Sequence, residues 1–142
     1  MSQLSAAISA AASALNVERT RIEVAVSNIA NAESTRGADG QPYRRRDVVL
    51  ASDPITNFDS MLGEAKAMGV KVAGIVQDQG AFRRRYEPSH PDADTEGFVS
   101  LPNVDAPQEM VDMLGAARAY QANLAAIGLI KEMVNRALEL GR

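Results

Sequence analysis

The sequence predicts an α+β fold in which long N- and C-terminal helices pair as a coiled-coil-like bundle and a small β-rich insert lies between them. Three observations predict this fold. Apolar residues recur in alternating steps of three and four at both ends of the chain, β-branched residues dominate the middle, and alanine supplies much of the hydrophobic content. We expect residues 1–35 and 103–142 to form one packing unit and residues 36–102 to form the insert.

The N-terminal segment carries a heptad seam, which predicts a helix over residues 3–32. Glu18 is the one breach in this seam, and Val26 widens it. The seam positions are Leu4, Ile8, Ala11, Leu15, Glu18, Ile22, Ala25 and Ile29.

The C-terminal segment repeats the pattern and predicts a helix over residues 106–140. Asp105 is placed as an N-cap and Pro107 lies in the first turn, where its missing N–H costs nothing. The predicted seam consists of Met110, Met113, Ala117, Tyr120, Leu124, Ile127, Lys131, Val134 and Leu138.

The middle of the chain reads as strands and turns. Four segments predict strands: "YRRRDVVLAS", "GVKVAGIVQD", "AFRRRYEP" and "GFVSLP". Asp39-Gly40 predicts a tight turn. Residues 56–67 predict a short helix within the insert.

Composition excludes several classes of function. The 142 residues have a net charge of −3 and a sequence pI of about 5.2, which disfavours nucleic acid as a partner. The chain has no cysteine, so thiolate chemistry and cysteine metal sites are excluded. The first 17 residues lack the basic start of a cleaved signal, and no stretch reaches the roughly 18 to 20 apolar residues of a membrane span. We expect neither signal cleavage nor direct membrane insertion.

No motif predicts catalysis, a cofactor or a metal ion. His90 is the only histidine and lies between prolines, which favours an exposed loop residue over a catalytic base. Asp92, Asp94 and Glu96 before Gly97 resemble the start of a calcium loop, but the last ligand position of such a loop is not acidic here, which favours a solvated turn.

Two arginine triplets, residues 44–46 and 83–85, lie in predicted strands. Alternate side chains of a strand point to opposite faces. Solvated faces with local ion pairs to Asp47, Asp53 or Glu87 and an electrostatic contact with an acidic neighbour explain the triplets equally well.

Asn28 and Asn31 lie on one helix face beside the first seam. Asparagine often ends helices, but two of them beside Ser27 and Ser34 exceed what a cap requires. Polar residues in a seam can fix register against a neighbouring chain. We therefore expect both asparagines to contact a neighbouring subunit.

The segments around the two predicted helices resemble the end signatures of the bacterial flagellar axial proteins, which form the rod and hook. The N-terminal match is Ser27-Asn28-Ile29-Ala30-Asn31-Ala32 with Ser34-Thr35 and Gly37, and the C-terminal match is Asn103-Val104-Asp105, Glu109-Met110-Val111 and Arg118-Ala119-Tyr120-Gln121-Ala122-Asn123. Within this family the short length and the segments "DGQPYRRRDVV", "YEPSHPDAD" and "GFVSLPNVD" resemble the proximal-rod members.

The resemblance implies a structural, non-enzymatic subunit of the basal-body rod, a helical tube that crosses the periplasm and transmits torque from motor to hook. It implies export through the flagellar type III apparatus without signal cleavage. The implied partners are other rod proteins, copies of the same chain, and the export apparatus or MS-ring region. The helices would form the inner packed layer and the insert would lie outside.

We expect the subunit contacts to come mainly from the helices. The predicted contact residues are Leu4, Ile8, Leu15, Ile22, Asn28, Ile29, Asn31, Met110, Met113, Tyr120, Asn123, Leu124, Ile127, Val134 and Leu138. Two alternatives stay open at this point: a different short axial protein of the same rod, and a helical export chaperone or adaptor.

Overall fold

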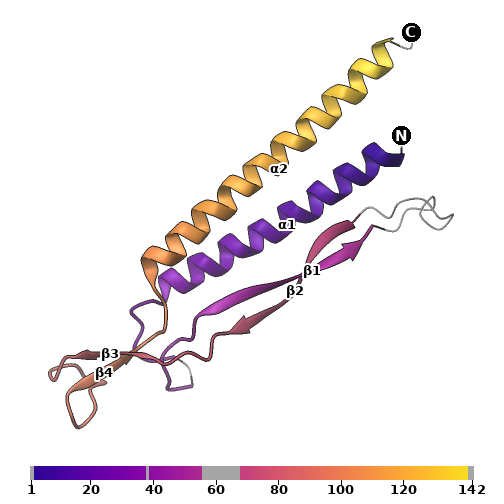
Figure 1. Cartoon of the computed structure of the whole chain (residues 1–142). Coiled ribbons are helices and arrows are strands. Elements are labelled where there is room, and N and C mark those ends of the chain that lie inside the picture. The colour runs from indigo at the N-terminus through magenta and orange to yellow at the C-terminus, as the bar shows by residue number, and fades with distance from the viewer. Residues whose placement is uncertain (1, 38, 56–67, 141–142) are drawn as a thin grey trace.

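The structure is a computed structural model that describes residues 2–37, 39–55 and 68–140. Helices α1 (Ser2–Ala30) and α2 (Ala106–Leu140) lie side by side and run antiparallel, with both ends of the chain at the same end of the pair (Figure 1). The predicted α+β class with two paired terminal helices is confirmed. The predicted short helix at 56–67 falls outside the described residues.

The described part of the insert contains two hairpins. β1 (Arg46–Pro54) pairs antiparallel with β2 (Met68–Gln77), and this hairpin lies along α1 on the side away from α2 (Figure 1). β3 (Arg83–Tyr86) pairs antiparallel with β4 (Phe98–Leu101) beyond the end of the helix pair. Each of the four predicted strand segments overlaps one of these strands: β3 and β4 lie within theirs, whereas β1 extends beyond its segment to Pro54 and β2 begins one residue before its segment, at Met68.

The helix bounds follow the local sequence. α2 begins and ends at the predicted residues, and the Glu109 amide donates to the Asp105 carbonyl in its first turn. α1 ends at Ala30, two residues before the predicted end, because the chain tightens into a turn at Asn31. The Asn31 carbonyl accepts hydrogen bonds from both the amide and the hydroxyl of Ser34.

The predicted seam of α2 is half correct. Met113, Tyr120, Ile127 and Val134 are partly buried, as a seam requires, whereas Met110, Leu124 and Leu138 are 49%, 54% and 61% exposed. The alternate seam positions lie one residue earlier, at Glu109, Ala116, Asn123 and Ile130. The prediction was wrong there because three of these four residues are small or polar, and a hydrophobic pattern favours the larger apolar neighbours that follow them.

The β1–β2 hairpin approaches α1 closely at Ser13. The Ser13 hydroxyl accepts a hydrogen bond from the Val70 amide at 3.1 Å and donates to the Ala10 carbonyl at 2.7 Å. A Cβ atom on Gly69 would lie 2.8 Å from the Ser13 Oγ, which is too close for any real Cβ contact. Glycine at residue 69 therefore permits this contact between helix and strand.

A small apolar core lies where β4 leads into α2. Its fully or nearly fully buried side chains are Ala32, Val99, Leu101, Pro102 and Val104. At the far end of β4, Gly97 has a φ of +83°, and an added Cβ would lie 2.9 Å from the Tyr86 ring. Glycine therefore permits the turn that brings Tyr86 against the edge of Phe98, with ring centroids 5.3 Å apart.

Candidate functional site: a polar junction and an exposed helix face

Asn28 is the centre of a buried polar cluster that joins three segments of the chain. Its side chain is 0% exposed, and its amide nitrogen donates to the Arg46 carbonyl and to Glu109 Oε2, both at 2.9 Å. Its amide oxygen accepts from the Tyr43 hydroxyl at 2.9 Å and from the Arg46 amide at 3.0 Å. Both donors and both acceptor positions of this side chain are therefore satisfied within the chain.

Glu109 is the second buried member of this cluster and is 2% exposed. Its Oε1 accepts from Arg45 Nε at 2.6 Å, and the Arg45 amide donates to Asn103 Oδ1 at 2.9 Å. Burial alone would lower the pKa of Arg45, but the hydrogen bond and the charge of Glu109 outweigh burial and hold that pKa above its usual value. We call Asn28, Tyr43, Arg45, Asn103 and Glu109 the polar junction.

The polar junction fixes α1 against α2 and the start of β1. Asn28 comes from the last turns of α1, Glu109 from the first turn of α2, and Tyr43 and Arg45 from the segment that enters β1. A buried amide or carboxylate without partners is costly, so these groups stabilise only the arrangement that pairs them all. The sequence singled out Asn28 but did not indicate Glu109 as its partner, or Arg45 as the partner of Glu109. The only available signal was a carboxylate in the buried face of a helix.

The second arginine triplet binds oxygens of the chain itself. Arg83 donates to the Pro102 and Ala32 carbonyls, which ties β3 to the end of α1. Arg85 pairs with Glu33 at 2.7 Å and with Glu87 at 2.9 Å.

Two predicted ion pairs therefore form, Arg85 with Glu87 and Arg45 with Asp47, the latter at 3.6 Å. The third predicted acidic partner, Asp53, pairs instead with Lys71 at 2.7 Å.

The acidic turn binds backbone amides and arginines. Asp94 Oδ1 accepts from the Phe98 and Glu96 amides, and these bonds together with Arg84 hold the pKa of Asp94 below its ordinary value. Asp92 pairs with Arg36 at 2.9 Å, and His90 Nδ1 accepts from the Asp92 amide. These contacts tie the turn to β3 and to the segment that follows α1.

A face of α2 beside the seam stays exposed. Met110, Leu114, Leu124 and Leu138 are between 49% and 61% exposed, and we call them the exposed α2 face. Three of them were predicted as contact residues. The remaining predicted residues lie within the helix pair or at its margin: Asn28 is fully buried, and the partly buried ones are Leu4, Ile8, Leu15, Ile22, Ile29, Asn31, Met113, Tyr120, Asn123, Ile127 and Val134.

Comparison with known proteins agrees with this architecture. Residues 8–38 match a family model described as flagella basal body rod protein, and residues 95–140 match one described as flagellar basal body rod FlgEFG protein C-terminal. The chain is 43% identical over 132 residues to the flagellar basal-body rod protein FlgC of Salmonella typhimurium, covering 93% of each chain. The chain belongs to the FlgC family. FlgC proteins of Bacillus subtilis and Borreliella burgdorferi are 41% and 38% identical to it, over 95% and 96% of this chain.

Membership of the FlgC family makes the chain a structural, non-enzymatic subunit of the flagellar basal-body rod. Near-complete coverage of FlgC relatives decides against a different axial protein and against an export chaperone. In the part of the chain that the structure describes, neither helix is long and apolar enough to span a membrane.

Proposed function

We propose that the helix pair joins this subunit to its neighbours in the rod, and that the exposed α2 face is one of its contact surfaces. The observation that carries the proposal is that α2 exposes seven large apolar side chains among the described residues, the four of this face together with Val111, Leu129 and Met133. Exposed large apolar side chains that repeat along a helix are typical of a surface that another chain covers. Residues 1–35 and 103–142 would then act as one assembling unit, with residues 36–102 outside it.

The partners in this proposal are other rod proteins and copies of the same chain. A rod subunit near the base would also meet the export apparatus or the MS-ring region, and the assembled tube would cross the periplasm and transmit torque from motor to hook. Export through the flagellar type III apparatus is part of the same proposal.

The predicted contact residues divide by their surroundings. Asn28 is saturated inside the chain, so its contribution to assembly would be to hold the polar junction in shape. Leu124 and its exposed neighbours would touch another subunit directly. Asn31 lies between these cases, because its amide donates to the Ser27 carbonyl while its side chain is partly exposed.

Replacing Leu124 by Asp tests the contact. The side chain is 54% exposed, so a charge there should leave the free energy of unfolding within about 0.5 kcal/mol, the usual range for surface substitutions. In a strain that carries only this variant, we expect assembled basal bodies and swimming to be lost.

Ile127→Asp is the matched control, since Ile127 is a partly buried seam residue one turn away. That variant should unfold the helix pair, which circular dichroism of the purified chain would detect. Normal swimming of the Leu124→Asp strain would remove the exposed α2 face from the proposed interface.

A further inference from the structure

One arginine of the two triplets has no oxygen partner for its side chain among the described residues. Five of the six guanidinium groups donate to carbonyls or pair with carboxylates, and these belong to Arg44, Arg45, Arg83, Arg84 and Arg85. The Arg46 guanidinium instead lies over the Tyr43 ring, 5.4 Å from its centroid, and is exposed. Among the six arginines of the triplets, Arg46 is therefore the candidate for an electrostatic contact with a neighbouring subunit.

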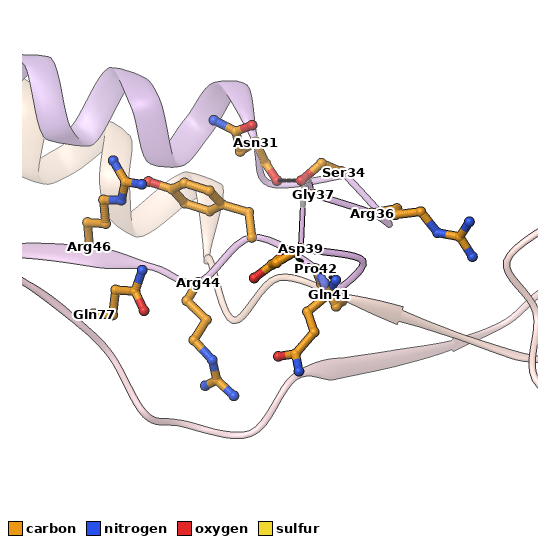
Figure 2. A pocket seen from close by; sticks show the side chains of 11 residues that line it. Asn31, Ser34, Arg36, Gly37, Asp39, Gln41, Pro42, Arg44, Arg46 and Gln77 are labelled. Atoms are coloured by element: carbon orange, nitrogen blue, oxygen red, sulfur yellow. Dashed lines mark hydrogen bonds between the residues drawn. The ribbon is translucent and has the colours of Figure 1, made fainter.

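Arg46 borders a hollow of about 310 Å³ between the end of α1 and the start of β1. Its lining includes Asn31, Arg36, Asp39, Gln41 and Arg44 (Figure 2). Three arginines against one aspartate make this hollow positive, although the whole chain carries a net charge of −3. In Figure 2 the Arg36 side chain points away from the other two arginines, and Arg36 already pairs with Asp92.

The backbone of Arg46 is held in place before any partner arrives. Its amide and its carbonyl both bond to the Asn28 side chain, which is fully buried. The Tyr43 hydroxyl also bonds to Asn28, so the ring beneath the guanidinium is fixed by the same residue. A cation in a fixed position loses little freedom when it binds, which favours recognition of a carboxylate.

We propose that this hollow accepts an aspartate or glutamate side chain of an adjacent rod subunit, with the Arg46 guanidinium as its ionic partner. Gln41 and Gln77 are exposed members of the lining whose amides suit the second carboxylate oxygen. The inference rests on the proposed role as an assembling subunit and adds the chemistry of one contact. The chain has 18 acidic and 15 basic residues, so a neighbouring copy of it also offers carboxylates to this hollow.

Arg46 and its neighbour Arg45 provide a matched pair of variants. Arg46→Gln should lower the urea midpoint of the purified chain only slightly, because its side chain gives up the contact with the Tyr43 ring but pairs with no described carboxylate. Arg45→Gln should lower that midpoint, because Glu109 would stay buried without its cation.

The assembly experiment uses a strain whose own gene copy is replaced by Arg46→Glu, Arg46→Gln or Arg46→Lys, with basal bodies counted by electron microscopy. We expect about tenfold fewer basal bodies for Arg46→Glu, fewer for Arg46→Gln, and near-parental numbers for Arg46→Lys, since one charged contact is involved. Suppressors of Arg46→Glu should replace an acidic residue of the adjacent subunit by Lys or Arg.

Parental basal-body numbers for both Arg46→Glu and Arg46→Gln would overturn the proposal. Equal loss in Arg46→Lys would also overturn it, because charge would then not matter. If Leu124→Asp blocks assembly while the Arg46 variants do not, the contact at the hollow is wrong and the proposed function stands. If Leu124→Asp also assembles normally, the proposed interface fails as well.

Discussion

Asn28 shows at the scale of one residue why a polar side chain can occupy a helix seam. Its amide has two donors and two acceptor positions, and all four meet partners from other segments. One of these partners, Glu109, is negatively charged, and its Oε1 lies 2.6 Å from the Nε of the positively charged Arg45. Because every polar group of Asn28 is paired, burying it costs little free energy in the native arrangement. In any other register of the two helices these groups would lose their partners, and burying them would cost much more.

Asn28→Leu should therefore destabilise the chain severely. Leucine has the branched shape of asparagine but is larger, and it removes partners of Glu109 and of the Arg46 amide and carbonyl. Each buried polar group left unpaired costs roughly 1–3 kcal/mol, so we expect the free energy of unfolding to fall by at least about 3 kcal/mol. Urea denaturation followed by circular dichroism measures this change.

Asn123→Leu is the control for that experiment. Asn123 also lies in the seam, but the bond of its amide nitrogen goes to the Ala119 carbonyl of its own helix. Replacing it should change the free energy of unfolding by less than about 1.5 kcal/mol, because Asn123 is partly exposed and loses one hydrogen bond. Similar losses in the two variants would show that polarity in the seam, and not the polar junction, sets the stability.

At the scale of elements, the sequence predicts that a helix exists and where it begins and ends better than it predicts which side of that helix is buried. The heptad spacing of α2 predicted its bounds, because periodicity and a preceding Asp105 act locally. The inner side of α2 was misplaced at Met110, Leu124 and Leu138, because the true seam uses Ala116 and polar residues whose burial depends on partners elsewhere in the chain.

The arginine triplets illustrate the same limit. Their strands were predicted from local composition, but their partners lie far away in sequence, as Glu109 does for Arg45 and Glu33 does for Arg85. Charge pattern alone could not choose between solvent and a protein partner. Those long-range pairs required the fold.

The contact between α1 and the β1–β2 hairpin gives a prediction for a single methyl group. Gly69→Ala would place a Cβ 2.8 Å from the Ser13 Oγ and push the hairpin from the helix. We expect a loss of about 1–3 kcal/mol, as for other overpacked contacts. Thermal unfolding measures the loss, and faster hydrogen exchange of the Val70 amide would locate it at the bond to Ser13.

Gly74→Ala is the matched control on the same strand. A Cβ at residue 74 would meet nothing within 4 Å, so this variant should be neutral or slightly stabilising through the unfolded state. If both variants behave alike, close approach to α1 does not explain the glycine at residue 69.

At the scale of the whole molecule, the two ends of the helix pair differ in how many side chains they bury. The polar junction and the small core lie at the end of the helix pair away from the termini (Figure 1). From residue 4 onward the first buried residue of α1 is Val17, and from residue 131 to residue 139 only Val134 is not exposed. Among the described residues, burial in the helix pair is therefore concentrated at the end away from the termini.

This asymmetry predicts a gradient of local stability in the free chain. Amides at residues 4–10 and 131–138 should exchange hydrogen much faster than those at residues 22–30 and 109–118, because little buried surface opposes their opening. Hydrogen exchange with mass spectrometry measures the gradient on the purified monomer, and the Leu124→Asp chain should show the same pattern. In assembled rods the first two segments should become protected if neighbouring subunits cover them. Uniform protection of both helices in the dilute monomer would contradict this account, since the helix pair would then be complete without its neighbours.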